Sequence, residues 1–125
     1  MRALLSKCSA NNSTLLYLGF VVLLSYFTYM HNYQNPPYLF WDENYHIASA
    51  QKYLNGIFFM EPHPPLGKML IALGEKIING NKVDTGFDDA FITTDYGKTL
   101  PGGFSFAGYR FFPSLLGWML APMLF

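Results

Sequence analysis

Residues 15–30 read LLYLGFVVLLSYFTYM, a run of sixteen residues without a charged side chain. Ser13 and Thr14 extend the run to about the length that a helix needs to cross the hydrocarbon core of a bilayer. We therefore predict a transmembrane helix over residues 13–31, preceded by an N-terminal tail, residues 1–12. A cleaved secretory signal is the alternative, but no cleavage site of the small-x-small type follows the run.

The composition of the 125-residue chain agrees with a membrane protein. Hydrophobic residues make up 51% of it, aromatic residues 18% and charged residues 13%, which is more apolar than an ordinary soluble domain. The net charge is zero and the basic residues are scattered, so neither a nucleic-acid-binding surface nor a polybasic lipid patch is predicted. The single cysteine provides neither a disulfide framework nor a cysteine-based metal site within this chain.

The basic residues also indicate an orientation. Arg2 and Lys7 precede the first helix, whereas no Lys or Arg occurs from His31 to Gln51. Because positive residues favour the cytoplasmic side, we expect the N-terminal tail in the cytoplasm.

A second apolar run, FFPSLLGWMLAPMLF, fills residues 111–125 directly after Arg110. We predict the truncated start of a second transmembrane helix over residues 109–125. Two helices could not enclose a site in a bilayer, so we expect an N-terminal fragment of an all-α, multi-pass integral membrane protein.

Residues 32–108 are then the first extracytoplasmic loop, in which we expect two helices lying at the membrane interface. The first covers about residues 42–55, with Asp42 as its N-terminal cap and Gly56 as its C-terminal stop. Tyr and Trp side chains alongside it suit the headgroup level of a bilayer.

The second interfacial helix covers about residues 65–79. A proline starts it, and Gly80 is the expected stop. One face of this helix is apolar: Leu66, Leu70, Leu73 and Ile77. Three charged residues interrupt the apolar surface: Lys68, Glu75 and Lys76. A helix so interrupted and so short is predicted to lie along the membrane.

The neighbouring carboxylates Asp42 and Glu43 are the first candidates for chemistry. A structural explanation is helix capping, because carboxylates in a first turn suit the free amides and the helix dipole. A carboxylate at the boundary between water and membrane also serves as a general base on a hydroxyl nucleophile. Both interpretations stay open at this point.

The sequence EPHPPLGK, residues 61–68, is the second candidate. Three prolines stiffen the backbone around His63 and direct the N-terminus of the following helix, whose free amides attract anions. Lys68 in the first turn opposes the helix dipole, a conflict that an anion would relieve. His63, Lys68 and the helix start could thus hold a phosphate, unless Lys68 only extends its charge to the interface and His63 is an ordinary loop residue.

Arg110 is the third candidate. It is an interfacial anchor, or it pairs with Asp42 or with a lipid phosphate through its planar guanidinium group. No metal site is predicted, although Glu61 with His63 could bind one. Four aspartates lack the spacing of a calcium loop and indicate a solvated segment: Asp84, Asp88, Asp89 and Asp95.

Taken together, these motifs resemble a known family. FWDENYHIASAQKYLNGIFFMEPHPPLGKMLIALGEKIINGN, residues 40–81, resembles the first extracytoplasmic loop of the protein O-mannosyltransferases, with Asp-Glu, Y-x-x-G-x-F-F and H-P-P-L-[GA]-K in order. YRFFPSLLGWMLAP, residues 109–122, is similar to the start of that family's second helix. The resemblance covers about residues 39–122.

The resemblance implies a polytopic glycosyltransferase of the GT-C class with a lumenal or periplasmic active site. Such enzymes transfer a sugar, typically mannose, with inversion from a polyprenyl-phosphate carrier to Ser or Thr of a protein. Asp42 matches the catalytic base, Glu43 the second acidic residue and Arg110 the arginine of helix two. His63 and Lys68 fall in the loop motif, near which related transferases place a basic residue for the donor phosphate.

The same resemblance implies the surroundings of the protein. The lipid-linked sugar is a cosubstrate and no cofactor is expected. No metal is needed, because His63, Lys68 and Arg110 could supply the positive charge for the leaving phosphate. Membrane lipids, a hydroxyl acceptor and a second copy of the chain as dimer partner are the expected contacts, in a bacterial inner membrane or the endoplasmic reticulum.

The chain also departs from the family pattern. Eukaryotic members usually carry a His soon after the Asp-Glu, in a D-E-x-x-F-G-like setting from which DENYHIASA differs in detail. No MIR module occurs in this chain, so a protein, a lipid or a glycan stays open as the acceptor. A noncatalytic membrane subunit or lipid-binding module is the main alternative. A transporter fragment would carry charges within its spans, whereas here they lie at or outside the span boundaries.

Overall fold

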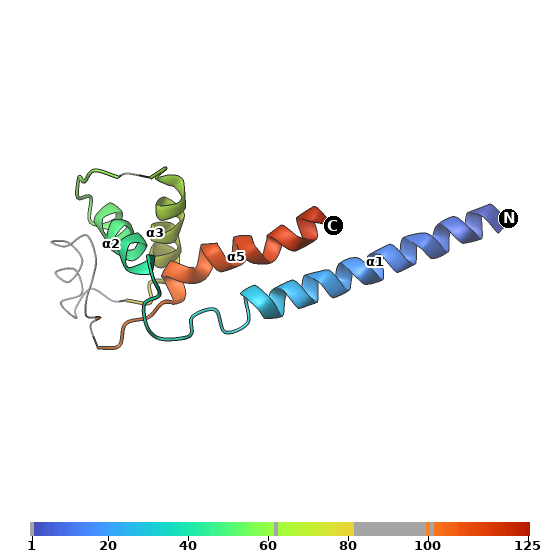
Figure 1. The fold of residues 1–125 in the computed structure, drawn as a ribbon, viewed down its shortest axis with the longest axis horizontal. Helices are drawn as coiled ribbons and strands as arrows, with labels where there is room; N and C mark the ends of the chain where they lie inside the picture. Colours follow the sequence, from blue (N-terminus) through green and yellow to red (C-terminus); the bar gives the residue numbers. More distant parts are fainter. Residues whose placement is uncertain (1, 62, 82–99, 101) are drawn as a thin grey trace. The chain divides into compact units, whose positions relative to one another are not determined.

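The computed structural model describes residues 2–61, 63–81, 100 and 102–125, with side chains described from residue 12 onward. All regular structure in these ranges is helical, as predicted (Figure 1). The chain divides into two compact units, residues 1–31 with 114–125 and residues 32–113.

The first unit contains α1 (Arg2–Tyr29) and the later part of α5 (Ala107–Leu124), which run antiparallel (Figure 1). Trp118 joins them, because its carbonyl oxygen accepts a hydrogen bond from Ser25 Oγ at 2.8 Å and its indole Nε1 donates to the Val22 carbonyl at 3.2 Å. These bonds satisfy polar groups on otherwise apolar helices, as a lipid environment requires.

Among the described residues, α1 is the one helix long and apolar enough to cross a membrane, over Asn12–Tyr29. α1 begins at Arg2, inside the segment that the sequence predicts as an N-terminal tail. The second predicted span is helical from Ala107, two residues earlier than expected, and its passage through a membrane stays a prediction.

The second unit holds α2 (Glu43–Leu54) and α3 (Leu66–Ile78), which pack side by side (Figure 1), together with the first residues of α5. Its core consists of small aliphatic side chains and two aromatic rings: Ile47, Ala48, Ala50, Ala72, Phe106 and Tyr109. Small residues let the helix backbones approach. A Cβ on Gly74 would overlap the Gly108 carbonyl oxygen, so α3 and α5 meet at two glycines.

The ends of these helices correct two predictions. Asp42 stands at the N-cap position of α2, but its side chain makes no capping hydrogen bond. Instead, Glu43 Oε2 accepts from the Phe40 amide at 3.2 Å. In α3 the left-handed residue at the C-terminus is Asn79, with φ of 50°, and not Gly80; asparagine tolerates this conformation at a helix end.

The surface of α3 is unusual for a protein in water. Its apolar residues Leu66 and Ile77 are 68% and 61% exposed, whereas the charged residues Lys68 and Glu75 are buried. An apolar face left uncovered within these residues agrees with the predicted position along a membrane, which stays a prediction. The four aspartates between residues 84 and 95 and Pro62 lie outside the described residues.

Candidate functional site

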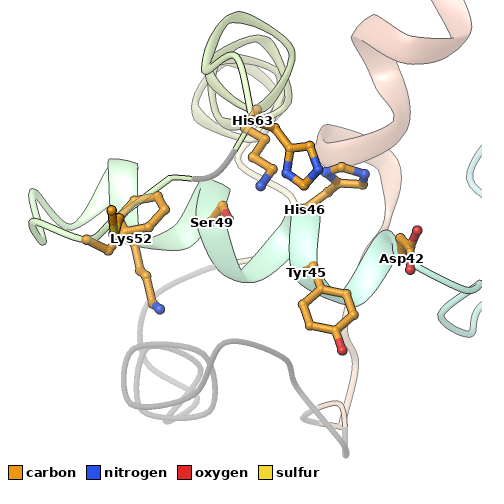
Figure 2. A pocket seen from close by; sticks show the side chains of 9 residues that line it. Asp42, Tyr45, His46, Ser49, Lys52 and His63 are labelled. Atoms are coloured by element: carbon orange, nitrogen blue, oxygen red, sulfur yellow. The ribbon is translucent and has the colours of Figure 1, made fainter.

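A cavity of about 660 Å³ lies beside α2 within the second unit. Residues from α2, from the loop before α3 and from α3 itself line it: Asp42, Tyr45, His46, Ser49, Lys52, Phe59, Met60, His63 and Lys68. We call it the α2–α3 cavity. Figure 2 shows its α2 side chains with His63 opposite them. Three of the five predicted site residues therefore line one cavity.

Asp42 enters the cavity from the turn before α2. The preceding residue, Trp41, has a φ of 35°, a strained value for a residue with a side chain, of the kind that often marks functional sites. The Asp42 side chain is exposed and makes no hydrogen bond or ion pair in the part of the chain that the structure describes. Its oxygens are thus open to a substrate hydroxyl.

His63 and Lys68 are positioned by a buried carboxylate that the sequence suggested only as a metal ligand. Glu61 Oε1 accepts a hydrogen bond from Lys68 Nζ at 2.5 Å and another from the His63 amide at 3.2 Å. The side chains of Lys68 and Glu61 are 8% and 10% exposed, whereas that of His63 is 72% exposed. The loop motif therefore presents an accessible imidazole beside a buried ion pair.

The electrostatics of Glu61 follow from this pairing. Burial raises its pKa, but the hydrogen bonds from Lys68 and the His63 amide and the charge of Lys68 outweigh burial, so the pKa lies below its usual range. Lys68 Nζ carries three N–H donors and gives one to Glu61. Within the described residues, two donors are left for a further acceptor.

Glu43 and Arg110 form a second cluster at the other side of Asp42. Arg110 Nε donates to Glu43 Oε1 at 2.6 Å and Nη2 donates to Oε2 at 2.8 Å, a bidentate ion pair. The guanidinium carbon also lies 3.9 Å from the centre of the Phe106 ring. Of the pairings considered from sequence, the one with Asp42 is not observed, and the one with a lipid phosphate stays a prediction.

The remaining Arg110 donors bind the segment before α2. Nη1 donates to the carbonyl oxygens of Gln34 and Pro36 at 3.0 and 2.8 Å, and Nη2 to that of Tyr38 at 2.9 Å. All five guanidinium N–H groups are therefore used within the second unit. The prediction that Arg110 binds the donor phosphate stays a prediction, and the geometry adds a positioning role.

A second, smaller cavity of about 320 Å³ is lined by Glu43 and Arg110, among others. It shares Asp42 and His46 with the α2–α3 cavity. These two residues, one helical turn apart, thus lie where the two spaces meet.

Sequence reasoning missed His46, Ser49 and Lys52 as cavity residues. The signal was present, because positions 42, 46 and 49 share one face of a helix that starts at Asp42. It also missed the hydrogen bond from Gln51 Nε2 to the Tyr109 hydroxyl, which joins α2 to α5 inside the core. No three His, Cys, Asp or Glu side chains in the described residues group as a metal site would require.

Comparison with known proteins gives the family. Residues 19–125 match the family model described as dolichyl-phosphate-mannose-protein mannosyltransferase. The chain is 34% identical over 108 residues to protein O-mannosyl-transferase 2 of Danio rerio, covering 86% of this chain and 13% of that protein. It is 32% identical over 115 residues to dolichyl-phosphate-mannose--protein mannosyltransferase 1 of Candida albicans, covering 92% and 12%.

A third relative, protein O-mannosyltransferase 1 of Drosophila melanogaster, is 31% identical over 103 residues, which cover 82% of this chain and 11% of that protein. The chain therefore spans between 11% and 13% of the length of these relatives. No solved structure matches it significantly. The family match extends over most of the chain and includes all five predicted site residues, so the chain belongs to the dolichyl-phosphate-mannose-protein mannosyltransferase family.

Proposed function

We propose that the chain is the N-terminal part of an inverting membrane glycosyltransferase that moves mannose from dolichyl phosphate mannose to a Ser or Thr hydroxyl of a protein. The family and the names of the relatives support the donor and the protein acceptor. The observation that carries the proposal is the open Asp42 carboxylate in the same cavity as His63 and Lys68. A base and hydrogen-bond donors for the phosphate in one cavity are what this transfer needs.

Asp42 acts as the general base in this proposal. Its carboxylate takes the proton of the acceptor hydroxyl as that oxygen attacks the anomeric carbon of mannose. The bond from this carbon to the phosphate oxygen breaks on the opposite face, and dolichyl phosphate leaves with the bonding electrons. Because phosphate is stable as an anion, no second carboxylic acid is needed to protonate the leaving group.

His63 and Lys68 bind the leaving phosphate. Lys68 is held by Glu61 but keeps two N–H donors without a partner in the described part of the chain, and the accessible His63 imidazole lines the same cavity. The first amides of α3 add donors beside Lys68. Hydrogen bonds of this kind stabilise the negative charge that develops as the sugar departs.

Glu43 and Arg110 hold Asp42 in place. Arg110 fastens the carbonyl groups of residues 34, 36 and 38 and the first residue of α2, so it fixes both flanks of the turn that presents Asp42. A direct contact of Arg110 with the donor phosphate would require the release of one of these bonds. We therefore assign Arg110 first to positioning and second to phosphate binding.

The proposed setting is a multi-pass membrane protein with a cytoplasmic N-terminus and an extracytoplasmic loop over residues 32–108. Membrane lipids then contact the apolar face of α3, the lipid-linked sugar is a cosubstrate, and a second copy of the protein is a candidate dimer partner. Bacterial inner membrane and endoplasmic reticulum both fit this orientation.

The Asp42→Asn variant of the full-length protein in membranes tests the function. Asparagine keeps the shape of the side chain but accepts a proton poorly, so mannosyl transfer to an acceptor peptide should fall by at least about 10²-fold while donor binding persists. Asn44→Ala is the matched control, because Asn44 is the second residue of α2 and lines neither cavity. This variant should transfer normally. Near-normal transfer by Asp42→Asn would remove Asp42 as the base.

A further inference from the structure

His46 is a half-buried residue of α2 that none of the motifs includes. Its Nδ1 atom is shielded from solvent and has no hydrogen-bond partner within the described residues. A buried polar atom without a partner costs free energy, and in native proteins it calls for an explanation, of which a bound group is one. His46 lines both cavities, one turn after Asp42.

The other cationic groups near the site are already engaged. Lys68 is paired with the buried Glu61 carboxylate, and Arg110 gives its donors to Glu43 and to three carbonyl groups. Each pair contributes little net positive charge to the cavity. Lys52, the remaining cationic residue of the lining, lies over the ring of Phe59 at 5.3 Å. An anion in the cavity therefore needs ligands besides the motif cations.

The two imidazoles supply them. In Figure 2 the His46 ring, on α2, and the His63 ring, on the loop before α3, point into the same space. Imidazole N–H groups donate well to phosphate oxygens, whether the ring is neutral or charged. Two such donors from opposite elements would hold a tetrahedral anion between them.

We infer that His46 is a ligand of the carrier's phosphate group, with its ring turned so that Nδ1–H, which is shielded in this structure, donates to an oxygen that does not bridge to the sugar. The inference rests on the proposed function, to which it adds a binding residue outside the five predicted site residues. A phosphate held one helical turn from Asp42 places the attached anomeric carbon between the phosphate and the base. His46 thus sets the position of the donor relative to the general base.

Binding of labelled dolichyl phosphate to the full-length protein in lipid nanodiscs tests the inference without requiring transfer. His46→Leu should weaken binding about tenfold, the effect of losing one hydrogen bond to a charged group. His46→Asn keeps a donor near the Nδ1 position and should bind within about threefold of the wild type. His31→Leu, the same change at an exposed histidine of the first unit, should bind like the wild type.

Neutral dolichol separates phosphate recognition from packing. If His46→Leu weakens dolichol and dolichyl phosphate equally, or leaves dolichyl phosphate binding unchanged, the inference is wrong. If His46→Leu does not fold, His46→Ala replaces it as the variant without a donor. Equally poor binding by His46→Asn and His46→Ala would then overturn the inference, because the donor retained in His46→Asn should have rescued binding.

Transfer assays distinguish this inference from the proposed function. In an active wild type, His46→Leu should raise KM for dolichyl phosphate mannose with a smaller change in kcat, and KM for the acceptor peptide should stay the same. A wild type that binds dolichyl phosphate through His46 but transfers no mannose would refute the function and keep the inference.

Discussion

Lys68 and Glu61 form an ion pair that is almost fully shielded from water, which makes each residue dependent on the other. Removing one partner of a buried pair leaves an uncompensated charge, whereas removing both leaves a neutral interior. We expect Glu61→Gln and Lys68→Met each to lower stability by about 3 kcal/mol. The double variant should lose much less than the sum.

Thermal unfolding of the full-length protein in detergent measures this cycle. Because the pKa of Glu61 is depressed in the folded protein, the pair stabilises above the unfolded-state pKa and its contribution is lost as the pH falls through the folded-state pKa. Glu61→Gln should therefore be less sensitive to acid than the wild type. Additive losses in the double variant would show that the two side chains do not interact.

For single residues, the sequence predicted which side chains belong to the site better than it predicted which side chains they pair with. Asp42, His63 and Lys68 were all expected at the site, and all line one cavity. The pairing of Glu43 with Arg110 was not expected, since these residues are 67 positions apart and meet only in the folded second unit. The Glu61–Lys68 pair was not expected either, because it depends on the position of Glu61 in the loop relative to α3.

Among the elements, α3 shows what the spacing of apolar residues can predict, which is the helix, and what it cannot, which is the burial of a charged residue. The spacing of its leucines predicts a helix, and the structure has one at Leu66–Ile78. Periodicity cannot tell that Glu75 points inward, because its burial depends on Asn81 and on close contact with Gly108. Glu75 Oε1 accepts from the Asn81 amide and side chain at 2.9 Å each, while Oε2 has no partner among the described residues.

This arrangement predicts a pH-dependent weakness at the C-terminal end of α3. Burial raises the pKa of Glu75, and the hydrogen bonds from Asn81 lower it by less. A raised pKa means that the stabilising contribution is complete below the unfolded-state pKa and is lost as the pH rises through the folded-state pKa.

Glu75→Gln removes the buried charge and keeps the oxygen that Asn81 binds. We expect this variant to unfold at a higher temperature than the wild type at pH 7 to 8, with the difference vanishing in acid. Melting curves at several pH values in detergent measure it, and Lys76→Gln, at an exposed neighbour, is the control. A variant that is less stable than the wild type at neutral pH would show that the Glu75 carboxylate is stabilising in its charged form.

At the scale of the molecule, the sequence indicated a membrane protein and its family. The three-dimensional arrangement of the loop could not be predicted from it. Composition and the run at residues 15–30 predicted the class, because bilayer thickness sets a length that few soluble segments meet. The core of the second unit depends on alanines and glycines such as Ala50 and Gly108, whose role is close approach and which carry no pattern of their own. Such contacts are visible only in three dimensions.

The orientation of the chain yields the last prediction, because the proposed chemistry needs the second unit outside the cytoplasm. Cys8, the single cysteine of this chain, precedes the apolar run, whereas the exposed Lys76 belongs to the second unit. In sealed vesicles with the extracytoplasmic face outward, a membrane-impermeant maleimide should label Lys76→Cys and should reach Cys8 only after detergent is added. Cysteines elsewhere in the full-length protein are replaced by serine, and labelling of both positions in detergent is the control for reactivity. If Cys8 and Lys76→Cys label from the same face of intact vesicles, α1 does not cross the membrane, and Asp42 could not meet a donor presented on the opposite side.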